Sequence, residues 1–241
     1  MISVCMATYN GERFIKQQVD SILSQLSDND ELIISDDGSS DGTVEIIEAY
    51  NDARIKVLNH TKKIQDGMYK NFRYATENFE NALKYAHGDF IFLSDQDDVW
   101  VPGKVEKCLG LLEKYDCVVH NYQVIDENGK VNKKRYFEKN PMHKTVLGNV
   151  IDSHFRGCCM AFKNYLLKCV LPIPSKVIGH DYWIGALASH YGKVFYEIEP
   201  LIQCRWYDGT VSAYRRTSIW YKLRFRIDLL LSVFQRILRN K

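Results

Sequence analysis

Short apolar runs alternate with longer segments of helical periodicity through the first 120 residues of the chain. The apolar runs predict strands at 2–6, 31–35, 54–58, 89–94 and 117–120. The segments between them predict helices at 12–26, 42–50 and 68–86, with a further one starting at Pro102. Repeated strand–helix–strand units indicate an α/β fold, in which helices flank a mostly parallel, Rossmann-like central sheet.

The second half of the chain is less regular. Residues 126–130 predict a hairpin turn, because their Asn-Gly pair favours that turn. Three further strands are expected at 156–162, 194–198 and 201–204, and a helix is expected at 180–190. No repeat or linker interrupts residues 1–213, so we expect one domain there, followed by a helical segment at 214–241.

Charge is distributed unevenly along a chain whose total is nearly neutral. The 241 residues carry a formal net charge of +2, and 46% of them are hydrophobic, which excludes a disordered chain. Residues 214–241 hold eight basic residues and one acid, a charge of +7, which leaves −5 on the first 213 residues. The near-neutral total argues against nucleic acid as a partner, and the split indicates a separate role for the basic segment.

Seven cysteines are present, an odd number without a Cys-x-x-Cys pair. This usage predicts free, buried thiols in a reducing compartment, and the spacing does not predict a zinc site. The chain enters a strand at Ile2 without a basic segment and apolar run before it, so we expect no signal peptide. No run of about 18 uncharged apolar residues predicts a membrane span.

Polar clusters follow three of the predicted strands. They are Thr8-Tyr9-Asn10, Asp36-Asp37-Gly38 and Asp95-Gln96-Asp97-Asp98. The ends of parallel strands share one edge of a sheet, where such folds bind ligands. The carboxylates of 95–98 repel one another and suit a divalent cation, or else form a solvated loop with a helix cap. Those of 36–37 suit the hydroxyl or N–H donors of a ribose or base, or else a polar turn.

At these intervals, the three clusters resemble glycosyltransferase family 2, with the GT-A fold, over roughly residues 1–213. The segment Leu-Ser-Asp-Gln-Asp-Asp-Val-Trp is similar to bacterial rhamnosyl- and galactosyltransferase-like members. The resemblance implies a nucleotide-sugar half at 1–120 and an acceptor half at 121–213. It places these residues in the nucleotide-sugar pocket: Thr8, Tyr9, Asn10, Glu12, Asp36 and Asp37. It matches Asp95 and Asp97 to the DxD motif, with Asp97 as the metal ligand and Asp95 at the sugar nucleotide or as a second ligand.

Further motifs of the family lie in the second half. The segment from Gly157 looks like the glycine-led strand beside the acceptor, so Gly157 and Trp183 are expected on the acceptor side. Asp181 matches the family's acidic pair, which implies that it is the catalytic base, and a helix cap is the alternative.

The chain departs from the family after residue 204. Arg205 is a candidate partner of the donor diphosphate, with a surface salt bridge as the alternative. Tyr207 and Thr210 replace the His and Asn that relatives often carry, whereas Ser212 matches their serine. A metal or phosphate role for that histidine is therefore lost or changed in this chain.

The resemblance implies an inverting hexosyltransferase that depends on Mn²⁺ or Mg²⁺. Such an enzyme moves a sugar from a UDP- or dTDP-linked donor to a hydroxyl of a glycan or lipid-linked acceptor in bacterial surface polysaccharide synthesis. Two alternatives remain open: a sugar-1-phosphate nucleotidyltransferase, and a non-catalytic membrane-associated scaffold with a degenerate GT-A fold. A nucleotidyltransferase would be expected to carry a glycine-rich loop after the first strand, and this chain has none there. The intact acidic clusters argue against a non-catalytic scaffold.

Residues 214–241 predict a basic amphipathic helix. Its apolar stripe comprises Trp220, Leu223, Ile227, Leu230, Leu231, Phe234 and Leu238. Phe225 and Leu229 interrupt the polar face. Such a helix is typical of peripheral binding to an anionic membrane, which would place this cytoplasmic protein on the inner face of the cell membrane. Docking of the stripe on the body, or self-association, is the alternative.

Overall fold

The computed structural model describes residues 1–61, 70–143, 145–207 and 219–240. Met68, Thr210, Ser212 and three basic residues of the tail lie outside the described residues: Arg215, Arg216 and Lys241. The first half alternates strands and helices as predicted. Its elements are β1 (Ile2–Thr8), α1 (Ile15–Leu23), β2 (Glu31–Asp36), α2 (Thr43–Glu48), β3 (Ile55–Asn59), α3 (Lys70–Leu83) and β4 (Phe90–Ser94).

These four strands form the parallel part of the sheet, in the order β3-β2-β1-β4. The central strand β1 is apolar and buried on both faces, as expected for a strand that helices cover on each side. The register pairs Thr8 with Asp36 on β2, and Met6 with Ser94 on β4. The carboxyl ends of β1, β2 and β4 therefore share one edge of the sheet, as the sequence predicts.

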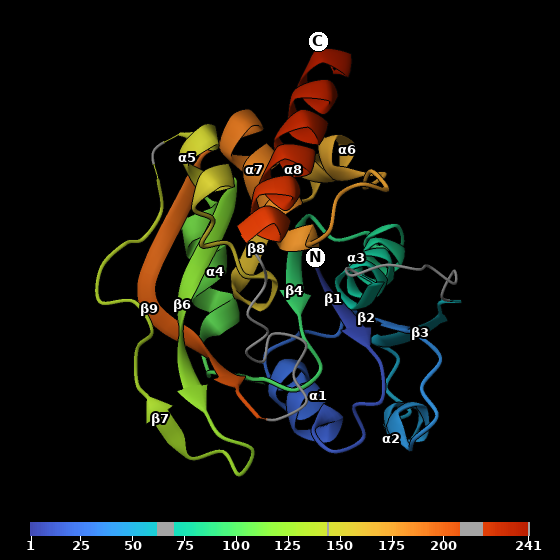
Figure 1. The fold of residues 1–241 in the computed structure, drawn as a ribbon. Coiled ribbons are helices and arrows are strands. Elements are labelled where there is room, and N and C mark those ends of the chain that lie inside the picture. The colour runs from blue at the N-terminus through green and yellow to red at the C-terminus, as the bar shows by residue number, and fades with distance from the viewer. Residues whose placement is uncertain (62–69, 144, 208–218, 241) are drawn as a thin grey trace.

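The second half completes the sheet with strands of both directions. Its elements are β5 (Val99–Trp100), α4 (Lys104–Leu112), β6 (Cys117–Ile125), β7 (Val131–Lys133), α5 (Val146–Ile151), η1 (Gly157–Cys159), β8 (Met160–Lys163), η2 (Asn164–Leu166), α6 (Leu167–Val170), α7 (His180–Tyr191) and β9 (Val194–Arg205). Strand β8 is antiparallel to both β4 and β6, whereas β9 runs parallel to β6. The sheet curls between two groups of helices, with α1 and α2 at one end of the molecule and α5, α6 and α7 at the other (Figure 1).

Two helices begin later than predicted. Residues 11–14 form a turn in which the N–H groups of Phe14 and Ile15 both donate to the Gly11 carbonyl, so α1 begins at Ile15. Helix α4 begins at Lys104, because Gly103 adopts a φ of 84° that ends the preceding turn. Left-handed backbone of this kind favours glycine.

Two predicted strands differ from the structure. Residues 157–159 form the 3₁₀ turn η1, so the strand expected at 156–162 begins only at Met160. The strands expected at 194–198 and 201–204 are one strand, β9, whose pairing with β6 shifts register at Asn121. The Asn121 side chain donates to the Ile198 carbonyl at 3.1 Å, which satisfies a backbone group that the shift removes from the ladder. The predicted hairpin at 126–130 is confirmed, with a Gly129 φ of 83°.

Helix α8 (Ile219–Arg239) docks on the body through the face that carries Phe225 and Leu229, the two residues that interrupt its predicted polar face. Leu229 and Val233 are buried, and Phe225 packs against Tyr182 at 5.2 Å between ring centroids. Arg236 reaches the carbonyls of Cys169, Leu171 and Pro172, which anchors the helix against the segment after α6.

The predicted apolar stripe of α8 faces outward. All seven of its residues are exposed, from 38% at Leu230 to 76% at Trp220. The alternative in which this stripe docks on the body is therefore wrong. Within the described residues, no helix combines the length and apolar character needed to cross a membrane.

Candidate functional site

The loop after β1 lies between the loops after β2 and β4 and is hydrogen-bonded to both. The Thr8 hydroxyl donates to Asp36 at 2.7 Å, and the side chain of Gln96 bonds both the N–H and the carbonyl of Tyr9. The three polar clusters predicted from sequence therefore form one continuous rim at the carboxyl edge of the sheet. The Tyr9 side chain is 49% exposed on this rim, where a planar ligand can stack on it.

Several predicted nucleotide-binding side chains hold the rim together. The Asn10 amide oxygen accepts from the Ser40 N–H at 2.9 Å, and the Glu12 carboxylate accepts from the Gly42 N–H at 2.7 Å. Asp36 is buried and accepts from the N–H of Ser39 at 2.7 Å. These contacts order the loop that faces a ligand, and they leave fewer free acceptors than the sequence suggests.

Asp37 is also buried, and its carboxylate pairs with the Nδ1 atom of His60 at the end of β3. The sequence did not single out His60, because it lies after a strand with no other polar motif. The pair brings a fourth strand end, that of β3, to the same edge of the sheet.

The acidic turn at 95–98 concentrates negative charge at the rim. Burial raises the pKa of Asp97, and the charges of Asp98 and Asp95 raise it further. Burial likewise raises the pKa of Asp95, and Asp98 adds to this effect. Asp98 is buried, and one of its oxygens accepts from the Arg205 N–H at 2.9 Å. It precedes the short strand β5 and caps no helix, so that alternative for the turn is wrong.

Crowded carboxylates of this kind fit a divalent cation, because oxygen ligands suit Mg²⁺ and Mn²⁺ and a cation removes the repulsion. Asp97 and Asp95 are half-buried at the rim, whereas Asp98 faces inward. Asp95 and Asp97 are therefore the two carboxylates of this turn that a cation at the rim could reach.

Tyr207 lies where relatives often carry a histidine, and the structure places its phenol on the acidic turn. The hydroxyl donates to Asp97 at 3.1 Å, and this bond opposes the rise in the pKa of Asp97. The residue at this position in the chain is therefore a phenol that contacts the acidic turn.

Arg205 is buried inside the protein, with an exposed fraction of 4%. Its guanidinium donates to the carbonyls of Asp97, Asp126 and Glu127 and to the side chain of Gln17. These partners are neutral, so the alternative of a surface salt bridge is wrong. The guanidinium that was expected at the donor diphosphate bonds backbone carbonyls and Gln17 instead. The arginine ties α1, the acidic turn and the 126–130 hairpin together, and we treat it as a positioning residue.

Asp181 approaches the acidic turn from the other half of the chain. It lies in the first turn of α7, half-buried, and its charge contributes to the raised pKa of Asp95 after burial and Asp98. Gly179 occupies the cap position of this helix, so Asp181 is not the helix cap. The charge of the predicted base therefore acts on the acidic turn.

Two residues expected on the acceptor side are buried instead. Trp183 is fully buried, and its indole N–H donates to the Val170 carbonyl at 2.9 Å. Gly157 is also buried, and a Cβ atom there would lie 2.5 Å from Nε2 of His180. Neither can contact an acceptor, and Gly157 instead leaves room for the His180 ring that stacks on Phe79.

Comparison with known families decides the classification. The model of Glycosyl transferase family 2 matches residues 3–171. The chain belongs to glycosyl transferase family 2. The assignment made from the three rim motifs is therefore confirmed.

Two bacterial glycosyltransferases are similar to about half of the chain. A UDP-Glc:alpha-D-GlcNAc-diphosphoundecaprenol beta-1,3-glucosyltransferase of Escherichia coli is 35% identical over 135 residues, which are 55% of this chain and 50% of that protein. A dTDP-rhamnosyl transferase of Shigella flexneri is 34% identical over 119 residues, 48% of this chain and 37% of that protein. The chain thus spans half or less of the length of these two relatives.

The fold is also that of solved GT-A enzymes. A mannosyltransferase from Pyrobaculum calidifontis, solved in complex with GDP-Man and Mn²⁺, superposes with a TM-score of 0.60. The match covers 99% of this chain and 64% of that one, at 18% identity. The predicted GT-A fold with a C-terminal helix is confirmed.

Proposed function

We propose that this chain is the catalytic part of an inverting hexosyltransferase that uses a UDP- or dTDP-linked sugar. Its acceptor would be a hydroxyl of a glycan or lipid-linked acceptor in bacterial surface polysaccharide synthesis. The observation that carries the proposal is the single rim that the loops after β1, β2 and β4 form at the carboxyl edge of the sheet, where the acidic turn at 95–98 lies. Sugar transfer needs charge compensation at the leaving group and a base at the attacking hydroxyl, and two neighbouring acidic groups supply both.

The rim would bind the donor, and the second half the acceptor. Tyr9 offers an exposed ring for the base, and half-buried Asp95 offers a carboxylate for the hydroxyl groups of the ribose or sugar. Asp97, with Asp95 beside it, would hold Mn²⁺ or Mg²⁺. When bound, such a cation offsets the negative charge of the leaving diphosphate.

Asp181 would act as the base. Its carboxylate takes the proton of the acceptor hydroxyl while the hydroxyl oxygen bonds to the anomeric carbon and the bond to the diphosphate breaks. Attack from the face opposite the leaving group gives one displacement and inverts the anomeric configuration. Gly179 donates its N–H to Thr76 at 2.9 Å, which fixes the start of α7 and so the position of Asp181.

Helix α8 would hold the enzyme at an anionic membrane, where a lipid-linked acceptor lies. Its outward stripe is apolar, and exposed basic residues flank that stripe: Lys222, Arg224 and Arg239. Leu147 and Ile151 of the neighbouring helix α5 are also exposed, each by 52%, and extend the apolar surface. Apolar side chains bordered by basic ones suit the headgroup region of an anionic membrane.

A panel of UDP- and dTDP-sugars, each with Mn²⁺ and a lipid-linked glycan acceptor, tests the proposal. We expect one donor to yield free nucleoside diphosphate and an elongated acceptor with inverted configuration. Release of pyrophosphate from a sugar 1-phosphate and a nucleoside triphosphate would identify a nucleotidyltransferase instead. Binding of a donor without any turnover would support the scaffold.

A further inference from the structure

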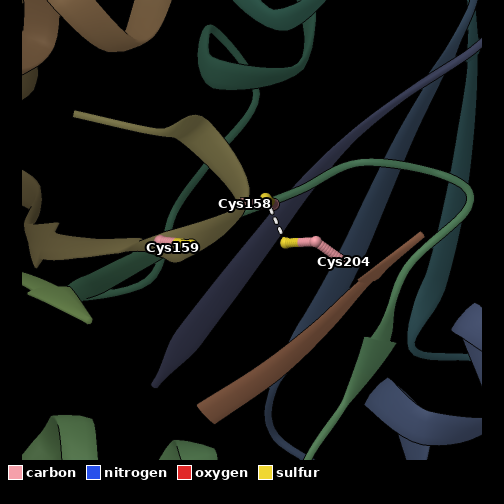
Figure 2. A group of neighbouring side chains, drawn as sticks. All are labelled: Cys158, Cys159 and Cys204. Carbon is pink, nitrogen blue, oxygen red and sulfur yellow. Dashed lines mark hydrogen bonds between the residues drawn. The ribbon is translucent and has the colours of Figure 1, made fainter. Parts of the chain in front are cut away.

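Three cysteines that are separated in sequence meet beneath the acidic turn. Cys158 and Cys159 lie on η1, and Cys204 reaches them from the end of β9 (Figure 2). Their Sγ atoms all lie within 4.8 Å of one another, and Cys158 and Cys204 are 3.7 Å apart. All three side chains are buried.

The sulfur spacing matches that of thiolates sharing one metal ion. Zinc–sulfur bonds are about 2.3 Å long and tetrahedral, which places two ligand sulfurs about 3.8 Å apart. The separation of 3.7 Å between Cys158 and Cys204 agrees with this value. The Cys159 sulfur lies within 4.8 Å of both atoms, so the three sulfurs gather at one point where they can share a metal ion.

Asp98 supplies an independent observation. It is 3% exposed, and within the described residues its Oδ2 atom has no hydrogen-bond partner. Its carboxylate lies within 4.8 Å of the Cys158 sulfur. A buried carboxylate oxygen without a partner is costly, and a metal ion would satisfy it as the fourth ligand.

Lys104 places a buried positive charge next to the cysteines. It is fully buried, and its ammonium donates to the Cys158 carbonyl at 2.9 Å and lies 4.1 Å from the Trp100 ring centroid. Buried lysines normally have a charged partner, and burial lowers the pKa of this one. Three thiolates and Asp98 around a divalent ion would carry a charge of −2, which Lys104 and the adjacent Arg156 would offset.

We propose that Cys158, Cys159 and Cys204, with Asp98 as the fourth ligand, form a structural site for a thiophilic divalent cation of the zinc class. On binding, each thiol releases its proton to solvent and forms a metal–sulfur bond. The bound ion would link η1, the acidic turn and the end of β9. The carboxylate of half-buried Asp95 lies within 4.8 Å of Asp98 and Cys158. A cation would therefore enter from the rim beside Asp95.

Cobalt(II) reports such a site directly, because thiolate ligation gives intense sulfur-to-metal charge-transfer absorption that oxygen ligands do not give. The full chain, purified reduced and stripped of metal, is titrated with Co²⁺ and then with Zn²⁺. We expect one Co²⁺ per chain with the charge-transfer band, proton release during the titration, and loss of the band when Zn²⁺ displaces Co²⁺. Absence of the band in this unmutated protein would overturn the proposal.

Variants locate the site. Cys204→Ala should lose the band, whereas Cys117→Ala, which removes a buried thiol of β6 outside the cluster, should keep it. Asp97→Asn should also keep it while losing Mn²⁺-dependent donor binding, so failure of the thiol site and failure of the proposed transferase are distinguishable. A band that persists in a folded Cys204→Ala variant would contradict the ligand assignment.

Discussion

The phenol of Tyr207 donates a hydrogen bond of 3.1 Å to the carboxylate of Asp97, 110 positions earlier in the chain. The bond joins the end of β9 to the acidic turn after β4, the two segments that enclose the predicted metal position. Tyr207, which replaces the histidine that relatives often carry, therefore acts on Asp97 as a neutral donor.

Replacement of Tyr207 by phenylalanine should shift the pH dependence of the enzyme. The phenol lowers the pKa of Asp97, so its removal lets that pKa rise further. Asp97 must be ionised to bind a cation. As the pH is lowered, the variant should therefore lose activity at a higher pH than the wild type does. Initial rates at saturating donor, measured across pH, check this. The exposed Tyr85→Phe is the matched control and should leave the profile unchanged; equal profiles for Tyr207→Phe and wild type would contradict the role of the bond.

Asp97→Asn should stabilise the metal-free protein increasingly as pH rises. The pKa of Asp97 is raised in the folded protein, so the folded state binds more protons at this residue than the unfolded state does. Its contribution to the free energy of unfolding therefore falls as the pH rises from about 5. Asparagine cannot ionise and avoids this loss. Buried His120 and His180, whose pKa values are lowered, give the opposite slope, so the informative quantity is the difference in Tm between variant and wild type.

That difference should widen from pH 5 to pH 8 without metal and reverse in sign with Mn²⁺, which only the wild type binds tightly. Asp28→Asn removes an exposed acid and serves as the control. A difference in Tm that does not change with pH would show that burial and the neighbouring carboxylates do not raise the pKa of Asp97.

Gly157→Ala should destabilise the protein by about 1–3 kcal/mol, because its Cβ would lie 2.5 Å from Nε2 of the buried His180 ring. Gly110→Ala is the matched control, since that glycine lies in α4 with nothing within 4 Å of the added carbon. Helix propensity predicts that this control gains about 1 kcal/mol. Chemical denaturation of both variants measures the free energies of unfolding, and equal effects would exclude the packing explanation.

The outward stripe of α8 should determine membrane binding. A triple variant, Leu223→Ser, Ile227→Ser and Phe234→Ser, removes three exposed apolar side chains and none of the docking residues. Partitioning onto anionic phosphatidylglycerol vesicles should fall by at least about tenfold, with little change in Tm. Val131→Ser with Tyr85→Ser, two exposed apolar residues elsewhere, should bind as the wild type does. Wild-type protein that does not sediment with the vesicles would end the membrane proposal.

Local patterns were enough to predict the rim. The strands before Thr8, Asp36 and Asp95 are apolar runs with short polar ends, and the rule that parallel strands end at one edge then places their polar residues together. The hairpin at 126–130 follows from its Asn-Gly pair for the same reason, since the signal is contained in a few adjacent residues.

Roles that depend on tertiary contacts could not be predicted in this way. Arg205 was expected at the diphosphate, but the crossing of β9 past the acidic turn buries it among carbonyls. Trp183 lies on the helix that carries Asp181 yet points into the core. In α8 two apolar faces exist, and periodicity alone does not say that Leu229 and Val233 dock while the longer stripe stays outside.

The cysteine cluster was missed because its members come together only in the folded sheet. Cys158 and Cys204 are 46 positions apart, and β8 and β9 both pair with β6, which brings them together. No Cys-x-x-Cys spacing signals such a site.

The central claim is that donor binding and proton removal belong to two different acidic groups. The direct measurement compares Asp181→Asn with Asp97→Asn, using Mn²⁺-dependent thermal stabilisation by the donor for binding and product formation for transfer. We predict that Asp181→Asn keeps donor binding and loses transfer by about 10²–10⁴-fold, whereas Asp97→Asn loses Mn²⁺-dependent donor binding itself. Normal turnover by Asp181→Asn, or unchanged Mn²⁺-dependent binding by Asp97→Asn, would contradict this division of roles.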